Sequence, residues 1–182
     1  MRIIGGCEKG RRLLKLSGTS IRPTSDMIKE ALFNMLPEIP GKRFLDLFAG
    51  TGSVGLEALS RGADQVVFVE KDFSCIEIII RNLHHCRFEG RYECLAMSAE
   101  KALGLLRRRA GSFDLIFLDP PYDEEYVQET LVKIEAANLL CEDGCVAVQR
   151  SMRENVDIKL GRLYIDYERK YGDTFVSFYK LK

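Results

Sequence analysis

One short apolar segment, Leu115 to Leu118, places the strongest constraint on how this chain can fold. An unbroken apolar run is typical of a strand that is buried on both faces of a parallel sheet. The run is followed by Asp119-Pro120-Pro121-Tyr122, and the two prolines cannot continue a sheet because they have no N–H to donate. The chain must therefore leave the sheet at Asp119, at the carboxyl end of a strand, where open α/β sheets bind their ligands.

Buried strands and amphipathic helices alternate along most of the chain. The apolar and alternating runs predict strands at residues 44–48, 65–70, 92–96, 113–118, 145–149, 163–167 and 174–179. Helical spacing of apolar side chains predicts helices at residues 26–36, 53–61, 72–85, 99–109 and 125–137. The last two predicted strands flank a turn and form an antiparallel hairpin. The expected fold class is therefore α/β, with a mostly parallel sheet that closes with a C-terminal hairpin.

Length and composition are those of one globular domain. The chain has 182 residues, of which 46% are hydrophobic and 30% are charged. No apolar run approaches the ~20 residues that a membrane helix needs, and the first residues lack the apolar segment of a secretory signal. The six cysteines form no Cys-x-x-Cys pair, so we expect reduced, mostly buried cysteines in a cytoplasm rather than disulfides or a metal site.

The first part of the chain, residues 1–22, is a basic extension that precedes the domain expected at residues 23–182. It carries six Lys or Arg residues and a single acid, Glu8. Two short strands joined by a turn, that is a small β-hairpin, fit its pattern. The whole chain is neutral, with 27 basic and 27 acidic residues, which by itself argues against a nucleic-acid binder. A local basic arm can still engage phosphates, and charge alone favours neither that interpretation nor a solvated hairpin.

A glycine-rich turn, Gly50-x-Gly52-x-x-Gly55, follows the strand predicted at residues 44–48. Glycines let the backbone approach a ligand closely, and the helix that begins here offers free N–H groups. Glu70 ends the next predicted strand, where its carboxylate can accept hydrogen bonds from both hydroxyls of a ribose. The spacing also satisfies the dinucleotide-binding fingerprint, so a nicotinamide-dependent oxidoreductase is one interpretation of this turn.

Three features favour S-adenosylmethionine over a nicotinamide cofactor. Asp46 interrupts the strand just before the glycine turn, near the place where a methionine ammonium group would need an anion. The chain ends in a hairpin rather than in a second mononucleotide-binding half. The Asp119–Tyr122 tetrapeptide has no evident use in hydride transfer.

The Asp119–Tyr122 tetrapeptide offers a narrow chemistry. The Asp119 carboxylate and the Pro120 carbonyl can accept both hydrogens of an exocyclic amine, and the Tyr122 ring can stack on a planar heterocycle. The tetrapeptide resembles the motif of methyltransferases that modify exocyclic amino groups of nucleic-acid bases. The alternative is a loop in which Asp119 caps a turn and Tyr122 packs. The position directly after a buried strand favours the catalytic interpretation.

Motifs along nearly the whole chain resemble, in the same order, those of bacterial 16S ribosomal RNA guanine-N2 methyltransferases. They are Arg2–Gly6, Arg22–Asp26 with Glu30–Asn34, Leu45–Gly52 and Asp119–Tyr122. The resemblance implies a Rossmann-like class I methyltransferase fold with a seven-stranded sheet, S-adenosylmethionine as cofactor, and methylation of one guanine in small-subunit RNA. The expected partner is 16S rRNA or the small ribosomal subunit, and we expect a cytoplasmic monomer that needs neither a metal nor a membrane.

The resemblance also assigns roles to individual positions. The implied cofactor residues are Asp46, Phe48, Gly50 and Gly52 at the methionine end, Glu70 at the ribose, and Met97, Ser98 and Ala99 at the adenine edge. The implied catalytic residues are Asp119, Pro120 and Tyr122. The basic extension and the loop after it supply the candidate RNA-binding residues Arg11, Arg12, Arg22 and Thr24. Related enzymes often place Asp where Ser98 stands, and a neutral hydroxyl accepts a hydrogen bond more weakly than a carboxylate.

Two other functions remain open on the sequence. An adenine-N6 or cytosine-N4 methyltransferase would use the same tetrapeptide, although no separate DNA-recognition domain is evident. A non-catalytic ribosome-assembly factor could retain the fold, but the intact Asp119, Gly50 and Gly52 argue against it.

Overall fold

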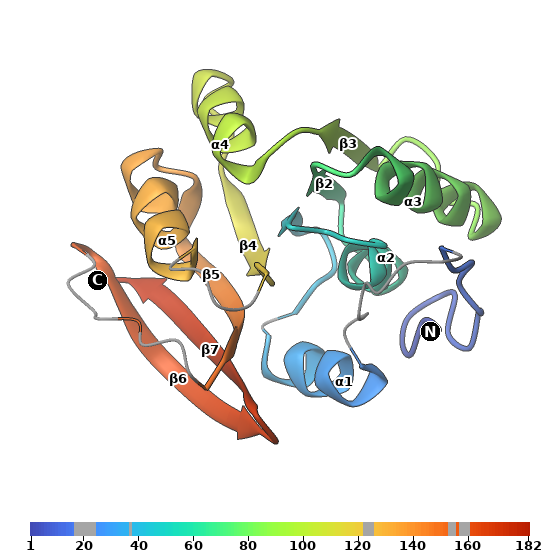
Figure 1. Ribbon diagram of the computed structural model, residues 1–182, viewed down its shortest axis with the longest axis horizontal. Helices are drawn as coiled ribbons and strands as arrows, with labels where there is room; N and C mark the ends of the chain where they lie inside the picture. Colours follow the sequence, from blue (N-terminus) through green and yellow to red (C-terminus); the bar gives the residue numbers. More distant parts are fainter. Residues whose placement is uncertain (17–24, 37, 122–125, 153–155, 157–160) are drawn as a thin grey trace.

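The computed structural model describes residues 1–16, 25–36, 38–121, 126–152, 156 and 161–182. Its helices are α1 (Asp26–Met35), α2 (Ser53–Ser60), α3 (Phe73–His85), α4 (Ala99–Arg108) and α5 (Tyr126–Ala136). Its strands are β1 (Arg43–Leu47), β2 (Gln65–Glu70), β3 (Tyr92–Ala96), β4 (Phe113–Leu118), β5 (Leu140–Ser151), β6 (Leu163–Tyr171) and β7 (Thr174–Leu181). All seven join one sheet in the order β3-β2-β1-β4-β5-β7-β6 (Figure 1). The first five strands are parallel and β7 runs antiparallel to both β5 and β6, which confirms the predicted α/β sheet with a C-terminal hairpin.

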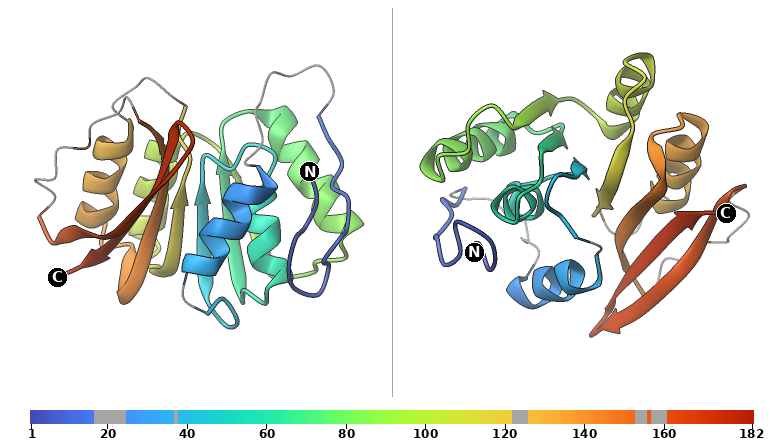
Figure 2. Two further views of the ribbon diagram at one scale, coloured as in Figure 1. Left: turned by 90° about the horizontal axis from the view of Figure 1, so that it is seen from below. Right: turned by 180° about the vertical axis from the view of Figure 1, so that it is seen from behind.

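Helices cover both faces of the sheet and bury one apolar layer on each. Leu32 of α1, Leu56 of α2 and Ile79 of α3 belong to the layer on one face. Leu103 of α4 and Leu131 of α5 belong to the layer on the other face (Figures 1 and 2). Because both faces are covered, ligands reach such a sheet at its edge, beyond the carboxyl ends of the strands.

The central strand β4 ends where the prolines predict. Its last residue, Leu118, pairs with Leu47 of β1 and Val148 of β5, so this end of the strand is enclosed between two neighbours. The chain leaves the sheet at Asp119, which therefore lies beside the carboxyl end of β1. The sheet thus brings the two predicted halves of the site, the glycine turn after β1 and the tetrapeptide after β4, to the same edge.

The basic N-terminal segment folds back on itself but forms less sheet than expected. The two predicted strands are reduced to a single antiparallel bridge between Arg2 and Arg12. The segment is instead fixed to the helices beside it: the Glu8 N–H donates to the Ser60 hydroxyl of α2 over 3.0 Å, and the Leu14 N–H donates to the Asn82 side chain of α3 over 2.7 Å. It therefore lies along α2 and α3 (Figure 2).

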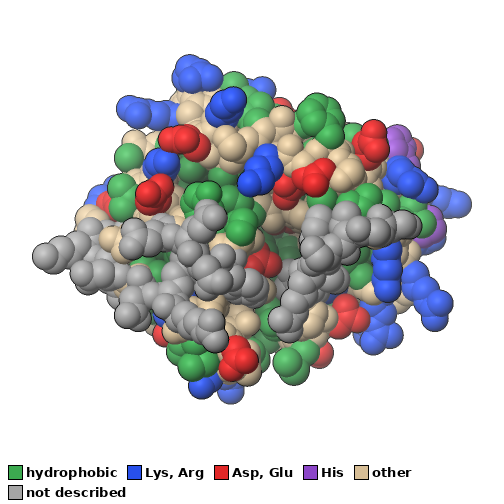
Figure 3. All heavy atoms as spheres, viewed as in Figure 1, with side chains coloured by type: hydrophobic (Ala, Val, Ile, Leu, Met, Phe, Trp, Pro, Cys, Tyr) green, Lys and Arg blue, Asp and Glu red, His purple; other side chains and the backbone are tan. Residues whose placement is uncertain are grey.

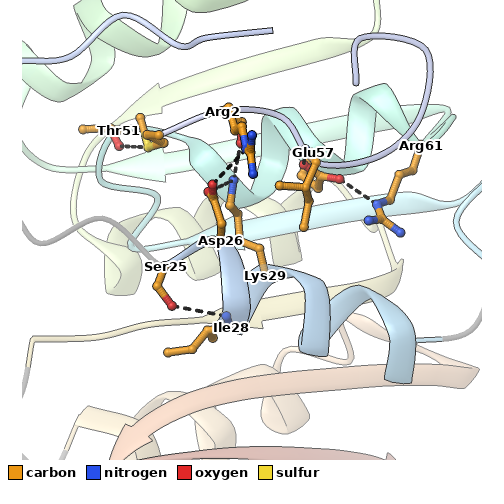
Figure 4. A network of polar contacts seen from close by, with 10 residues as sticks. Arg2, Ser25, Asp26, Ile28, Lys29, Thr51, Glu57 and Arg61 are labelled. Atoms are coloured by element: carbon orange, nitrogen blue, oxygen red, sulfur yellow. Dashed lines mark hydrogen bonds and ion pairs between the residues drawn. The ribbon is translucent and has the colours of Figure 1, made fainter. Parts of the chain in front are cut away.

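Two buried side chains of opposite charge, Lys29 of α1 and Glu57 of α2, each bind the start of this segment and hold it between the two helices. Both side chains are fully buried. The Lys29 ammonium donates to the Arg2 carbonyl over 2.6 Å and lies 3.4 Å from an Asp26 carboxylate oxygen. The Glu57 carboxylate accepts from the Ile4 N–H over 2.8 Å and from the Arg61 guanidinium over 2.7 Å (Figure 4). The basic segment is thus a fixed part of the domain surface.

Candidate active site

A pocket of about 680 Å³ opens at the carboxyl edge of the sheet. Among the described residues its lining includes most of the predicted cofactor positions: Asp46, Phe48, Gly50, Glu70, Met97, Ser98 and Ala99. It also includes the catalytic candidates Asp119 and Pro120. Residues from four separate strand ends are thus brought together around one cavity.

The turn after β1 takes its shape from residues with positive φ. Phe48 has a φ of 62° and Gly50 a φ of 52°, and the Gly50 N–H donates to the Glu70 carboxylate over 2.9 Å. Gly52, at φ 77°, precedes α2 and lies outside the pocket lining as described. A Cβ on Gly52 would lie 2.7 Å from the Ile79 side chain, so a glycine is needed here to let the turn pack against α3.

Glu70 is held at the end of β2 by backbone hydrogen bonds to both of its carboxylate oxygens. Oε1 accepts from the N–H groups of Lys71 and Asp72, over 2.7 and 3.0 Å, and Oε2 accepts from Gly50. A carboxylate oxygen has two lone pairs, so Oε2 keeps one acceptor site for a further donor. These bonds fix the carboxylate in place beside the glycine turn before any ligand arrives.

Asp46 is a buried carboxyl group in the wall of the pocket. It is 1% exposed, and the Gly55 N–H at the start of α2 donates to it over 2.8 Å. The pKa of Asp46 is raised from 3.8 to about 8, mainly by burial; the Gly55 N–H opposes this shift, and the nearby charges of Asp119 and Glu70 add to it. Within the described residues no cation forms an ion pair with this carboxyl group. An ammonium group in the pocket would therefore favour its ionised form and lower its pKa.

Replacing Asp46 with asparagine should change how stability depends on pH. The folded wild type keeps a proton that the unfolded carboxyl releases above its ordinary pKa of 3.8, so its free energy of unfolding falls as pH rises toward about 8. An asparagine side chain cannot titrate, so the stability of the Asp46→Asn variant relative to the wild type should rise by up to about 1.4 kcal/mol per pH unit between pH 5 and 8. Urea unfolding of the ligand-free proteins across this range measures it, with Asp64→Asn, an exposed change, as control. Parallel pH profiles for wild type and Asp46→Asn would contradict the prediction.

We call the part of the pocket lined by the predicted cofactor residues the cofactor half. One of its walls is formed by the connection between β3 and α4. Met97, Ser98 and Ala99 all line the pocket there. The Ser98 hydroxyl accepts from the Lys101 N–H over 3.4 Å, so it caps α4, as its position before the predicted helix indicated. The same hydroxyl can in addition donate a hydrogen bond into the pocket.

The catalytic half contains one predicted group that the structure does not describe. Asp119 is half-buried and Pro120 is buried, whereas Tyr122 lies outside the described residues. Tyr126, the first residue of α5, was not among the predicted site residues; its ring lies 6.3 Å from that of Phe48, and the residue lines the pocket. The available signal was an aromatic residue four positions beyond the tetrapeptide.

A nucleophilic cysteine is not part of this site. Cys75 lines the pocket, but burial, followed by the nearby charges of Glu70 and Asp72, raises the pKa of its thiol to about 11. It therefore stays a thiol at neutral pH. All six cysteines are free, and within the described residues no group of His, Cys, Asp and Glu is arranged to hold a metal.

The predicted RNA-binding residues fall into two groups. Arg12 is exposed, whereas Arg11 is half-buried and pairs with the Glu8 carboxylate. Arg22 and Thr24 lie outside the described residues. Figure 3 shows Lys and Arg side chains gathered at the edge of the molecule near the histidines that end α3, beside the N-terminal segment. The segment also reaches the pocket, because the sulfur of Met1 lies 3.5 Å from the hydroxyl of the pocket residue Thr51.

The sheet order, the turn after β1 and the tetrapeptide after β4 define a class I methyltransferase. The chain belongs to the family described as Conserved hypothetical protein 95, whose model matches residues 1–180. In the part of the chain that the structure describes, no helix is long and apolar enough to cross a membrane.

Named relatives agree with the family resemblance drawn from the motifs. The "Putative rRNA methyltransferase YlbH" of Bacillus subtilis is 40% identical over 99% of this chain and 98% of its own length. The "Ribosomal RNA small subunit methyltransferase D" of Haemophilus influenzae is 37% identical over 79% of this chain and 72% of its own length. The solved structure "Putative methyltransferase yhhF" from Escherichia coli matches with a TM-score of 0.87 and 28% identity, over 100% of this chain and 98% of its own. The expected family and fold are confirmed.

Proposed function

We propose that this protein transfers a methyl group from S-adenosylmethionine to the exocyclic N2 amine of a guanine in small-subunit ribosomal RNA. The observation that carries the proposal is that Asp46, Glu70 and Asp119, from three different strand ends, line one pocket. The relatives named as ribosomal RNA methyltransferases support the substrate class. The choice of guanine N2 depends on the motif resemblance. We further expect the protein to act as a monomer in the cytoplasm.

The residues present fit the proposed cofactor. Asp46 offers a buried carboxylate to the ammonium group of the methionine part, and Glu70 offers a fixed acceptor to a ribose hydroxyl. Met97 and Ala99 offer apolar surface to the adenine ring, and the Ser98 hydroxyl offers it a donor. When bound, S-adenosylmethionine supplies a methyl group that its sulfonium charge has already activated.

The chain's own contribution to the reaction is to hold and polarise the guanine amine. The amine is a poor nucleophile because its lone pair is delocalised into the ring. The Asp119 carboxylate and the Pro120 carbonyl accept its two hydrogens, which favours a pyramidal nitrogen with its lone pair directed away from them and into the cofactor half of the pocket. Positive charge then develops on the nitrogen, the Asp119 carboxylate stabilises it, and the methylated amine becomes neutral by releasing one proton to solvent.

The base must leave its helix to reach this pocket, because the amine of a paired guanine is not accessible. Tyr122 is proposed to stack on the extruded base. Tyr126, which already lines the pocket beside Phe48, offers a second aromatic face. The proposed site therefore needs single-stranded or locally opened RNA.

Mapping of the methylated nucleotide tests the proposal. Small-subunit RNA from cells with and without this protein should differ in one N2-methylguanosine, and the purified protein should restore it with S-adenosylmethionine as donor. Appearance of N6-methyladenosine or N4-methylcytidine would instead identify one of the alternative amino-methyltransferases. Binding of the RNA with no methylated product would identify an assembly factor.

Charge reversal in the basic segment should weaken RNA binding. Arg12→Glu removes an exposed cation. The negative slope of log K against log salt concentration should therefore become shallower, by about 1. Arg11→Glu should add to this effect, although Arg11 already pairs with Glu8. Filter binding at several salt concentrations measures the slope, with Arg108→Glu at the end of α4 as the matched control. An unchanged slope for the Arg11 and Arg12 variants would exclude this segment from the RNA-binding surface.

A further inference from the structure

The pocket extends beyond Asp119 into a part that the proposed cofactor residues do not account for. Its wall is formed under α1 and across the hairpin end of the sheet. The described residues here are Ser25, which caps α1, Ile28 of α1, Phe117 of β4, Thr130 of α5, Gln149 of β5 and Thr174 of β7. This part of the pocket lies on the side of Asp119 away from the glycine turn. A target base would be placed in this part, which we call the base half.

Gln149 is next to Asp119 in this wall. Leu118 of β4 pairs with Val148 of the parallel strand β5, so Asp119 and Gln149 are the next residues on neighbouring chains. Phe117 and Ala147 also pair, and both contribute to the apolar layer under α1 to α3. Because side chains alternate along a strand, Gln149 projects to that same side of the sheet. Neighbouring strands lie about 4.8 Å apart, so its amide is within reach of a group held on Asp119.

Gln149 is the first polar side chain after an apolar run in β5. The preceding residues of β5, from Cys145 to Val148, are all apolar and buried, and Gln149 itself is 5% exposed. Burying a primary amide is costly unless its hydrogen bonds are made. Gln149 lines the pocket, so its amide is placed where a ligand can contact it.

We propose that Gln149 determines base specificity by recognising the ring nitrogen next to the amine held by Asp119. This inference builds on the proposed function. In guanine the neighbour of the N2 amine is N1–H, a donor, whereas in adenine and cytosine the ring nitrogen beside the amine is an acceptor. The Gln149 carbonyl accepts from N1–H, and its amide N–H donates to O6, the next group along the guanine edge. Asp119 thus holds the reacting nitrogen, and Gln149 distinguishes guanine from the other amino bases.

Two replacements of Gln149 separate recognition from packing. Gln149→Met keeps the length of the side chain but has no strong acceptor, so kcat/KM on small-subunit RNA should fall roughly 10- to 100-fold. Gln149→Glu keeps an acceptor for N1–H but replaces the donor to O6 with a second acceptor, so it should lose activity and yet retain more of it than Gln149→Met. Cofactor affinity by calorimetry should stay within about twofold for both. Gln128→Met, on α5 and outside the described pocket lining, is the matched control and should behave as the wild type.

The substrate is small-subunit RNA from cells that lack the protein, and the methylated nucleoside is identified in every reaction. Wild-type rates for Gln149→Met would overturn the inference while N2-methylguanosine remained the product. Equal losses for the Met and Glu variants, together with weakened cofactor binding, would make Gln149 a structural residue and also overturn it. If the wild type itself formed a different methylated nucleoside, the proposed function would fail and this inference with it.

Discussion

Replacing Asp119 with alanine is expected to slow methyl transfer to RNA by roughly 10²- to 10⁴-fold, with little effect on cofactor affinity. The proposed contacts of Asp119 are with the base amine, and the positive charge they stabilise develops only as the nitrogen is methylated. The Asp119 charge also contributes to the raised pKa of Asp46. Its removal should therefore leave the cofactor half unchanged or slightly favour ionised Asp46. Single-turnover kinetics and calorimetry measure the two effects separately.

Two further variants make the Asp119 prediction specific. Asp119→Asn keeps an oxygen acceptor but loses the charge, so its rate should fall between those of the wild type and Asp119→Ala. Asp143→Ala removes an exposed carboxylate from β5 and should retain wild-type rates. Normal turnover by Asp119→Ala, or a loss of cofactor affinity as large as the loss of rate, would show that Asp119 does not hold the amine.

The order of strands and helices could be predicted because most of them carry local signals. Apolar runs such as residues 65–70 bury both faces of β2, and Ser98 caps α4 as its position indicated. The prediction for β5 was too short: it began at residue 145, whereas the strand begins at Leu140. Glu142 and Asp143 are exposed, and they lie where the pairing of β5 with β4 shifts register. Such an irregularity depends on the neighbouring strand and has no local signal.

The cofactor half of the site was more predictable than the base half. Its candidates lie in contiguous motifs at strand ends, and parallel strands bring their carboxyl ends to one edge. Gly52 is an exception, because it was predicted as a cofactor residue but lies outside the described pocket lining. Its lack of a side chain lets the turn pack against Ile79 of α3. In the base half, Thr130, Gln149 and Thr174 come from three different elements. Only the tertiary structure places them around one cavity.

The buried charges under the N-terminal segment were likewise invisible in the sequence. Glu57 follows Leu56 in an amphipathic helix, where an acid usually marks the solvent face. The structure covers that face with residues 3–8, which supply the Ile4 N–H to the Glu57 carboxylate. A segment whose charge alone favoured neither a phosphate-binding arm nor a solvated hairpin is therefore attached to the domain by a specific polar contact.

Replacing Glu57 with alanine should lower the free energy of unfolding by about 3–5 kcal/mol, because it breaks a fully buried charge network from one side. The Ile4 N–H and the Arg61 guanidinium would each lose their acceptor. Lys29, whose pKa burial already lowers, would lose one of the two carboxylates that favour its charged form, Asp26 being the other. Urea unfolding measures the loss. Hydrogen exchange at the Ile4 amide should accelerate as the segment detaches from α2.

Matched variants distinguish the buried network from a general effect of losing an acid. Glu77→Ala removes an exposed glutamate from α3 and should change stability by less than about 0.5 kcal/mol. Adding Lys29→Met to Glu57→Ala should restore part of the loss, because the buried ammonium is then gone as well. A Glu57→Ala protein as stable as the wild type, with unchanged exchange at Ile4, would show that the segment is fixed by its apolar contacts alone. Since this segment begins beside the pocket residue Thr51, its detachment should also weaken RNA binding more than cofactor binding.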